Sequence, residues 1–422
     1  MGHAGVKVVG SAIEVNEENR WRLATPGSAG WAKSARPGDP RGKYFMLSVD
    51  NHLTPPRTLF AERIERRFVD RLARIEIIKG RKMIVQEGLS PSPLPELEYF
   101  GEDLLRNAIG AAASPLSGTE TSMAERLAAQ EMDGVDAELI YPNGPGLLMF
   151  SSTDPEFVMA QCRVWNDWAM EYCRPELARC IPTACIGTGD VDLAVAEIQR
   201  TAALGYKVAF LPSKPIWGPE SNSKRPTYTH PDYDPIWAAL QDADMAIAFH
   251  IASGKDPRTA RGAGAAVMNF VVNAAAPTME PVVALCASGV IERFPKLRFS
   301  IIEANAGFLP WLLDMMDEAY LKHHMWQRPK LREMPSVYFR TNGACSVTED
   351  RSAFALVEEY GLVDNLMWAN DYPHHEGTWP HSGEAVERFF GKLSETAREK
   401  ILGLNAARFF RIEVPEKYRQ AV

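Results

Sequence analysis

The sequence has no CxxC cysteine pair and no long apolar stretch near its start, two features that mark several protein classes. Its 422 residues include six cysteines, and no two of them form a CxxC pair. This pattern disfavours a zinc ribbon and a thioredoxin-like redox site. Unpaired cysteines are typical of a reducing compartment, and residues 1–7 lack the apolar stretch of a signal peptide. We therefore expect a cytoplasmic protein.

The chain also lacks an excess of positive charge. It has 46 Lys and Arg residues against 54 Asp and Glu residues, a net charge of -8, and no basic run. Nucleic-acid binding needs clustered cations, so this balance disfavours it. One uncharged stretch, 262–279, is interrupted by Asn269, Asn273 and Pro277, and we interpret it as a buried loop and helix. We expect a small-molecule substrate, with neither nucleic acid nor membrane as a partner.

The remaining composition is that of an ordinary folded protein. Hydrophobic residues make up 46% and charged residues 24% of the chain, which excludes disordered, fibrous and disulfide-scaffold classes. The length permits two or three domains, or one α/β barrel with insertions. We predict an N-terminal extension over 1–43, a main domain over 44–410 and a C-terminal tail over 411–422. An inserted hairpin or cap is expected at about 72–122, with the hairpin turning at Lys79-Gly80.

Short apolar strands alternate with helices along the main domain. This alternation indicates βα units and a parallel sheet of about eight strands. No strand is followed by a glycine-rich phosphate-binding motif, so a (β/α)8 TIM barrel is favoured over a doubly wound sheet. The predicted strands cover 44–49, 137–142, 181–186, 207–212, 246–249, 298–302, 337–340 and 366–370.

Several of these strands end on residues that can bind a metal ion. Asp50 and His52 follow the first strand, and His250, Glu303 and Asp371 end three later ones. The strand ends of a parallel barrel meet at one rim, and positions i and i+2 of an extended segment share a face. A single strand-end His or Asp is more often structural, but a set of this kind predicts a divalent metal centre.

Other polar residues lie on loops near these strand ends. His374 is a candidate substrate contact because it follows Asp371 in the same loop. Arg57, Arg258 and Arg261 could grip a substrate carboxylate in a bidentate manner, although ordinary surface pairing is an equal alternative. Lys214 is interpreted as a solvated loop residue.

Three motifs resemble the amidohydrolase-related family, which includes aminocarboxymuconate semialdehyde decarboxylase and the resorcylate decarboxylases. They are SVDNHLTPP at 48–56, ERFPKLRF at 292–299 with GFLPW at 307–311, and MWANDYPH at 367–374 with TWP at 378–380. The resemblance implies a metal-dependent barrel with Asp50, His52, His250 and Asp371 as ligands. The decarboxylases usually have a His at the sixth strand, where this chain has Glu303.

The leading functional hypothesis is hydrolysis by a water that the metal ion activates. Asp371 would take the proton of the water, and Glu303 could pass a proton to the leaving group. Zinc is the first candidate ion and manganese the second. The alternative is non-oxidative decarboxylation of an aromatic or enoic acid, and a third hypothesis is an inactive barrel that only binds. Resemblance to dimeric relatives and the apolar stretch 264–287 predict a homo-oligomer, most simply a dimer.

Overall fold

Two parallel sheets form the centre of the molecule. The computed structural model describes residues 8–9, 12–13, 31–93, 120–143, 146–215, 227–253, 260, 262–374 and 377–419. One sheet has six parallel strands in chain order. They are β10 (Ala184–Cys185), β11 (Val208–Leu211), β12 (Ala246–His250), β13 (Phe299–Ile302), β14 (Gly343–Val347) and β15 (Leu366–Trp368). The expected α/β architecture with parallel strands is confirmed.

The second sheet contains the beginning of the main domain. Here β8 (Ala137–Pro142) pairs in parallel with β3 (Leu47–Ser48), β4 (His52–Leu53) and β9 (Cys180–Pro182). Only Thr183 separates β9 from β10. At the β15 edge of the six-stranded sheet, the amide of Val49 donates to the carbonyl of Trp368 at 3.1 Å, and the amide of Asp371 donates to the carbonyl of Asp50 at 3.0 Å. These bonds connect the first strand with the last.

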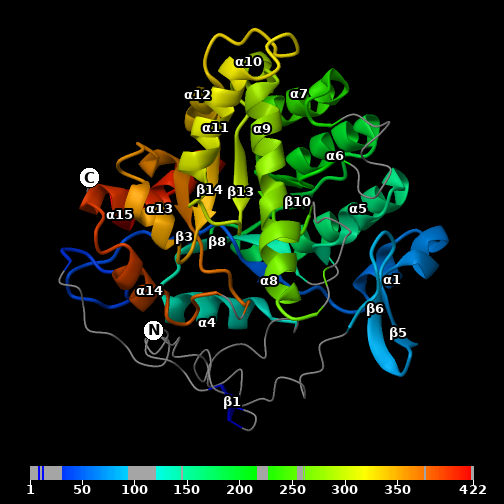
Figure 1. Ribbon diagram of the computed structural model, residues 1–422. Coiled ribbons are helices and arrows are strands. Elements are labelled where there is room, and N and C mark those ends of the chain that lie inside the picture. The colour runs from blue at the N-terminus through cyan, green and yellow to red at the C-terminus, as the bar shows by residue number, and fades with distance from the viewer. Residues whose placement is uncertain are drawn as a thin grey trace.

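Helices surround the strands (Figure 1). On one side lie α5 (Pro155–Cys173), α6 (Val191–Leu204) and α7 (Asp234–Asp242), and on the other α13 (Arg351–Leu356) and α15 (Glu395–Glu399). Local sequence sets their ends: the Asp190 side chain accepts from the Leu193 amide at the start of α6, and Gly205, with a φ of 99°, ends it. All five residues of β12 are buried, as expected for a strand covered on both faces.

One predicted strand is wrong. Residues 337–340 lie within helix α12 (Pro335–Asn342), and the strand is β14, which follows directly. Proline in the first turn favours a helix, and Tyr338 and Phe339 pack their rings into the core from it. A Cβ atom at Gly343 would lie 2.5 Å from the Phe339 ring. Close packing therefore selects small residues in β14, which hides its strand character in the sequence.

The predicted insertion contains the expected hairpin. Strands β5 (Arg74–Ile78) and β6 (Arg81–Val85) pair in an antiparallel manner and turn at Lys79 and Gly80, both with positive φ. The hairpin lies at the periphery beside α1 (Leu59–Arg63) (Figure 1). Residues 94–119 of the predicted cap lie outside the described residues. In the predicted extension, Trp31 and Ala35 are already buried in the core.

The apolar stretch near residue 270 is helical. It comprises α8 (Ala265–Phe270), a π-helical turn at Val271–Ala275, a 3-10 turn and α9 (Met279–Ala287). Among the described residues, Val267–Ala287 is long and apolar enough to cross a membrane, by length and composition alone. A core helix of a soluble protein passes the same test. The expectation of a buried segment is wrong for α8, where Val267, Met268 and Phe270 are 67%, 47% and 47% exposed.

Candidate metal centre

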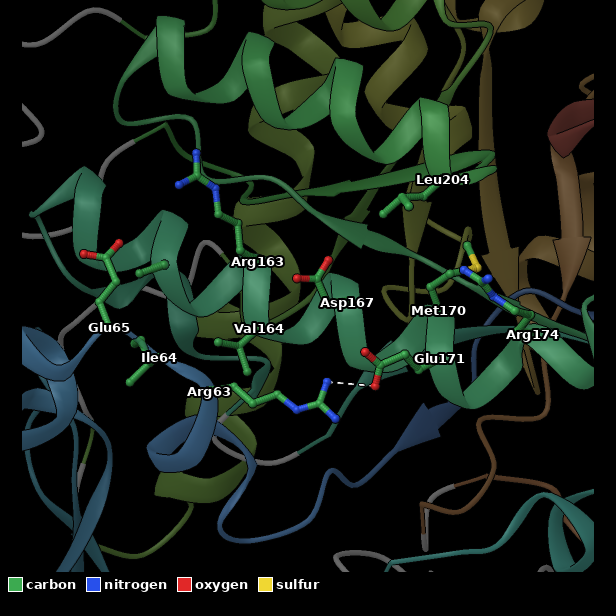
Figure 2. A pocket seen from close by; sticks show the side chains of 11 residues that line it. Arg63, Ile64, Glu65, Arg163, Val164, Asp167, Met170, Glu171, Arg174 and Leu204 are labelled. Carbon is green, nitrogen blue, oxygen red and sulfur yellow. Dashed lines mark hydrogen bonds and ion pairs between the residues drawn. The ribbon is translucent and has the colours of Figure 1, made fainter.

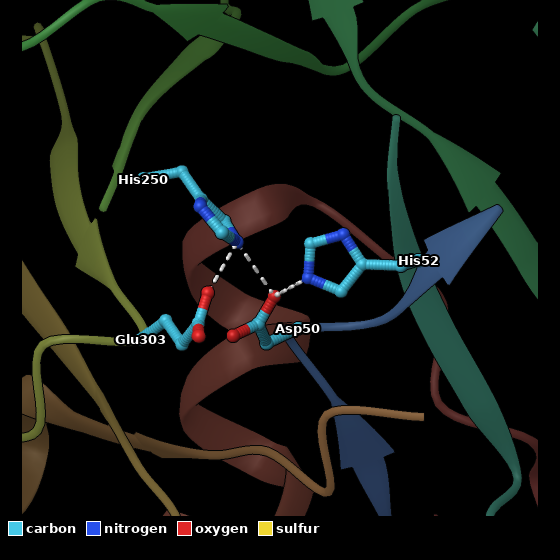
Figure 3. A group of neighbouring side chains, drawn as sticks. All are labelled: Asp50, His52, His250 and Glu303. Atoms are coloured by element: carbon cyan, nitrogen blue, oxygen red, sulfur yellow. Dashed lines mark hydrogen bonds and ion pairs between the residues drawn. The ribbon is translucent and has the colours of Figure 1, made fainter. Parts of the chain in front are cut away.

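Four predicted site residues from both sheets meet at the ends of their strands. Asp50 lies between β3 and β4, His52 begins β4, His250 ends β12 and Glu303 follows β13. Figure 3 shows their polar ends turned toward a common point. Asp50 Oδ1 lies 3.4 Å from His52 Nε2 and 3.1 Å from His250 Nε2. Glu303 Oε2 lies 3.2 Å from His250 Nε2.

Backbone carbonyls fix the orientation of both imidazole rings. Nδ1 of His52 lies 3.1 Å from the carbonyl oxygen of Pro142, and Nδ1 of His250 lies 2.9 Å from that of Ile251. A carbonyl oxygen only accepts, so each Nδ1 has the hydrogen and donates it. In the neutral ring Nε2 then presents a lone pair toward Asp50. Ligating histidines in metalloproteins are held in this way.

The spacing and burial of these atoms suit one divalent ion. Two ligand atoms on one ion, each about 2.1 Å from it, lie roughly 3.0–3.4 Å apart, as the three distances above do. Asp50, His52 and His250 are buried, and Nε2 of His52 has no hydrogen-bond partner. A buried polar atom without a partner is costly. The residues present therefore fit a metal ion.

Asp371 and His374 extend this cluster on its other side. Asp371 follows β15, and its Oδ1 lies 3.4 Å from His52 Nε2 and 3.0 Å from His374 Nδ1. The His374 ring stacks on the His52 ring with centroids 3.9 Å apart. Two overlapping groups result, each with ligand atoms within 4.8 Å of one another. They are Asp50, His52, His250 and Glu303, and His52, Glu303, Asp371 and His374.

The cluster strongly shifts the pKa values of its members. Burial opposes the protonation of His250, but the charges of Asp50 and Glu303 outweigh it and raise the pKa of His250 to about 9. Burial, together with the charge of His374, lowers the pKa of His52 to about 3. Burial disfavours ionisation of Asp50, yet both histidines hold the pKa of that carboxyl well below its usual range. In the metal-free protein at neutral pH, His250 is therefore protonated, whereas His52 is neutral.

Two carboxylate residues of the cluster have an unusual backbone conformation. Glu303 and Asp371 have φ values of 65° and 54°, in the left-handed region that non-glycine residues rarely adopt. This conformation costs about 1–2 kcal/mol per residue. Such strain persists where the surrounding structure imposes it, and it is concentrated at functional sites.

Buried residues behind the cluster were not found from the sequence. Arg126 of α4 (Met123–Asp133) pairs with Glu138 and donates to the carbonyl of His52 at 2.8 Å. Asn143 accepts from His374 Nε2 at 3.1 Å. Asn143 directly follows β8, so the expectation that site residues lie at the ends of parallel strands could have indicated it. Arg126 gives no such signal, because a helical arginine is usually exposed.

The outcome differs among the other sequence candidates. Arg258 and Arg261 fall outside the described residues, and Arg57 is exposed on a loop. Lys214 pairs with Glu280 at 3.4 Å. The structure brings His374 to the cluster, next to Asp371. The catalytic, ligand and substrate-binding roles of all these residues stay predictions.

A separate cavity lies on the outer side of α5. Its volume is about 330 Å³, and residues of α1 and α5 line most of it (Figure 2). Across it, Arg63 Nη1 donates to Glu171 Oε2 at 2.8 Å. None of the six clustered side chains lines this cavity. It is therefore distinct from the candidate metal centre.

One family is found by comparison with family models, and a shared fold by comparison with solved structures. A family model described as amidohydrolase matches residues 119–412. No curated protein matches the chain. Several solved structures share its fold.

A 5-carboxyvanillate decarboxylase from Sphingomonas paucimobilis is 21% identical, with a TM-score of 0.61 over 88% of this chain and 100% of that one. An amidohydrolase from Mycobacterium avium subsp. paratuberculosis is 21% identical, with a TM-score of 0.67 over 89% and 99%. A dihydroxybenzoic acid decarboxylase from Polaromonas sp., solved with manganese and 2-nitroresorcinol, is 17% identical, with a TM-score of 0.62 over 88% and 98%.

Proposed function

Because the chain belongs to the amidohydrolase family, we propose that it is a metal-dependent enzyme that decarboxylates an aromatic acid without oxidation. The observation that carries the proposal is the buried set of Asp50, His52 and His250, whose spacing suits one divalent ion. Structural neighbours that decarboxylate hydroxylated aromatic acids support this reaction over hydrolysis. We extend the proposal to a closed (β/α)8 barrel, which the backbone bonds between the first and last strands support.

In this proposal Asp50, His52 and His250 hold the ion. Mixed imidazole and carboxylate ligands suit zinc or manganese. The manganese in the Polaromonas neighbour favours manganese, which the sequence placed second. When bound, a divalent ion would supply a positive charge that orients the substrate carboxylate and withdraws electrons from it.

The chain itself must supply a proton. Decarboxylation breaks the bond between the ring carbon and the carboxyl carbon, releases carbon dioxide and puts hydrogen on the ring. Asp371 and Glu303 border the ion-binding set and are the carboxyl groups placed to hold that proton. The side chain of Glu303 is 12% exposed, whereas that of Asp50 is 1% exposed. Among the three carboxylates of the cluster, Glu303 is therefore the most accessible to an incoming substrate.

The test is a panel of hydroxylated benzoic acids with the manganese-loaded protein in D2O. We expect release of carbon dioxide and one deuterium on the ring carbon that lost the carboxyl group. The release should vanish on chelation and return with added Mn²⁺. Absence of carbon dioxide with every acid of the panel, from fully loaded protein, would contradict the proposal.

Hydrolysis is the second candidate, and the observation that favours it is Glu303. The three carboxylates Asp50, Glu303 and Asp371 lie in the two overlapping groups, and a carboxylate next to the ion can take a proton from water. A panel of lactones and amides in ¹⁸O-labelled water distinguishes the candidates. Incorporation of ¹⁸O into an acid product, without carbon dioxide, would favour hydrolysis.

A further inference from the structure

The side chain of Glu303 reaches the cluster because the backbone turns at this residue. Along β13, Ile301 packs in the hydrophobic core that contains residues of α9, whereas Ile302 packs in a second core together with Ala248 of β12. Successive residues of a strand point to opposite faces, so an extended continuation would direct Glu303 to the side of Ile301. Its φ of 65° breaks this alternation. The carboxylate turns inward instead, with Oε2 3.2 Å from Nε2 of His250 (Figure 3).

A buried serine on the next strand holds this turn. The amide of Glu303 donates to Oγ of Ser346 at 2.8 Å. Ser346 lies in β14 and is 1% exposed, although β14 contributes none of the six clustered side chains. A buried amide needs an acceptor, and a left-handed residue persists only where its surroundings impose that conformation. The hydroxyl oxygen of Ser346 meets both requirements at Glu303.

The other end of the same loop is held independently of this serine. The amides of Ala306 and Gly307 both donate to Oδ2 of Asp350 at 2.6 Å. Asp350 follows β14 and also accepts at the start of α13. Removal of the Ser346 hydroxyl should therefore free only the end of the loop that carries Glu303.

We propose that Ser346 is a positioning residue, which keeps the carboxyl group of Glu303 where it can deliver the proton of the reaction. This inference rests on the proposed function, in which Glu303 is one of two carboxyl groups placed to hold that proton. As carbon dioxide leaves, the electron pair of the broken bond stays on the ring carbon and takes the proton, and Glu303 becomes a carboxylate. Such a transfer requires hydrogen-bond distance, and a displacement of about 1 Å can cost roughly 10²-fold in rate.

The test compares three serine variants of the manganese-loaded protein on the hydroxylated benzoic acid of the panel that the wild type converts fastest. For Ser346→Ala we expect kcat to fall about tenfold or more, with KM and Mn²⁺ affinity within about threefold of wild type. Ser346→Thr keeps the acceptor oxygen and should restore kcat to within about threefold. Ser300→Ala is the matched control, because it removes a buried hydroxyl of β13 that donates to the carbonyl of Ile247 at 2.9 Å. It should behave as wild type.

A double variant tests whether Ser346 acts through Glu303. If it does, adding Ser346→Ala to Glu303→Gln should lower kcat by less than about twofold further, because the group that Ser346 positions is already gone. Melting temperatures of all variants report folding. A further tenfold loss in the double variant, or an unchanged kcat in folded Ser346→Ala, would overturn the inference.

Crystal structures of the wild type and of Ser346→Ala give a readout that needs no turnover. We expect Oε2 of Glu303 to move by about 1 Å or more away from Nε2 of His250 in the variant. If the wild type decarboxylates no acid of the panel, the proposed function fails, and this comparison still tests the role of Ser346. A Glu303 carboxylate that stays in place in Ser346→Ala would contradict the inference and leave the proposed function intact.

Discussion

At the scale of single residues, the histidines of the cluster owe their chemistry to the oxygen behind each ring. Pro142 and Ile251 accept from His52 and His250 through their carbonyls, which are fixed by the strand ends. The choice of tautomer is therefore built into the backbone. Sequence spacing predicted that these side chains converge, because strand ends in parallel sheets meet. It could not predict the tautomer, which depends on where distant carbonyls lie.

Metal binding should depend on pH through His250. Burial opposes its protonation, but Asp50 and Glu303 raise its pKa to about 9 in the metal-free protein. An ion that binds at pH 7 must displace this proton, so affinity should rise about tenfold per pH unit and level off above about pH 9. Calorimetry in buffers of different ionisation enthalpy measures the released proton. The His250→Ala variant should lose most affinity and the steep slope, and a flat profile in wild type would contradict the account.

Glu303 can be tested for its part in proton transfer. If Glu303 holds the proton of the reaction, Glu303→Gln in the manganese-loaded protein should lower turnover about 10²-fold or more. The ion should be retained. Turnover per folded molecule and melting temperature are measured on the same protein. A lower melting temperature with unchanged turnover would instead mean that Glu303 has only a structural role, in which it accepts hydrogen bonds from neighbouring groups.

At the scale of elements, the helices behind the sheet determine where the strand ends lie. Asp133, the last residue of α4, accepts from the Asn370 side chain and from the Ser382 amide, each at 2.9 Å. Asn370 immediately precedes Asp371, and Ser382 begins α14 (Ser382–Phe389). One buried carboxyl group thus joins α4, α14 and the end of β15. The sequence did not reveal this link, because an Asp at a helix end is usually solvated.

Asp133 should make stability depend on pH. Burial, only partly offset by the bonds from Ser382 and Asn370, raises the pKa of Asp133 to about 6, above its ordinary value of 3.8. Its contribution is therefore fully present below about pH 4 and is lost as pH rises through about 6. The loss amounts to at most about 3 kcal/mol. Chemical denaturation of wild type and Asp133→Asn from pH 4 to 8 measures the difference.

In the Asp133→Asn variant the amide cannot ionise, so this part of the pH dependence should disappear. Its amide nitrogen would also face the donor of Asn370, which should cost about 1–3 kcal/mol at pH 4. Parallel pH profiles for the two proteins would contradict the assignment.

Element prediction succeeded where pattern and packing agree. The strand at 137–142 and the helix at 191–204 were predicted with the bounds that the structure has. It failed at 337–347, where aromatic residues lie in a helix and small residues form the strand. There the packing of Phe339 over Gly343 decides the local structure, and a single sequence contains no sign of that contact.

At the scale of the whole molecule, an apolar surface on α8 and the π-helical turn after it bears on assembly. Val267, Phe270 and Val271 are 67%, 47% and 52% exposed, within the stretch from which a dimer was predicted. Exposed apolar patches mark interaction surfaces. If this surface joins two copies, Val271→Glu should convert a dimer into a monomer by light scattering at micromolar concentration. Val283→Glu, on the neighbouring α9, tests how far the surface extends. A wild-type monomer would refute the prediction.

A divalent ion at the buried strand ends can be located directly by an anomalous difference map from crystals of the manganese-loaded protein. We expect a peak about 2.0–2.2 Å from Asp50 Oδ1, His52 Nε2 and His250 Nε2 together. A fully loaded protein whose anomalous peak lies away from these three atoms would contradict this expectation.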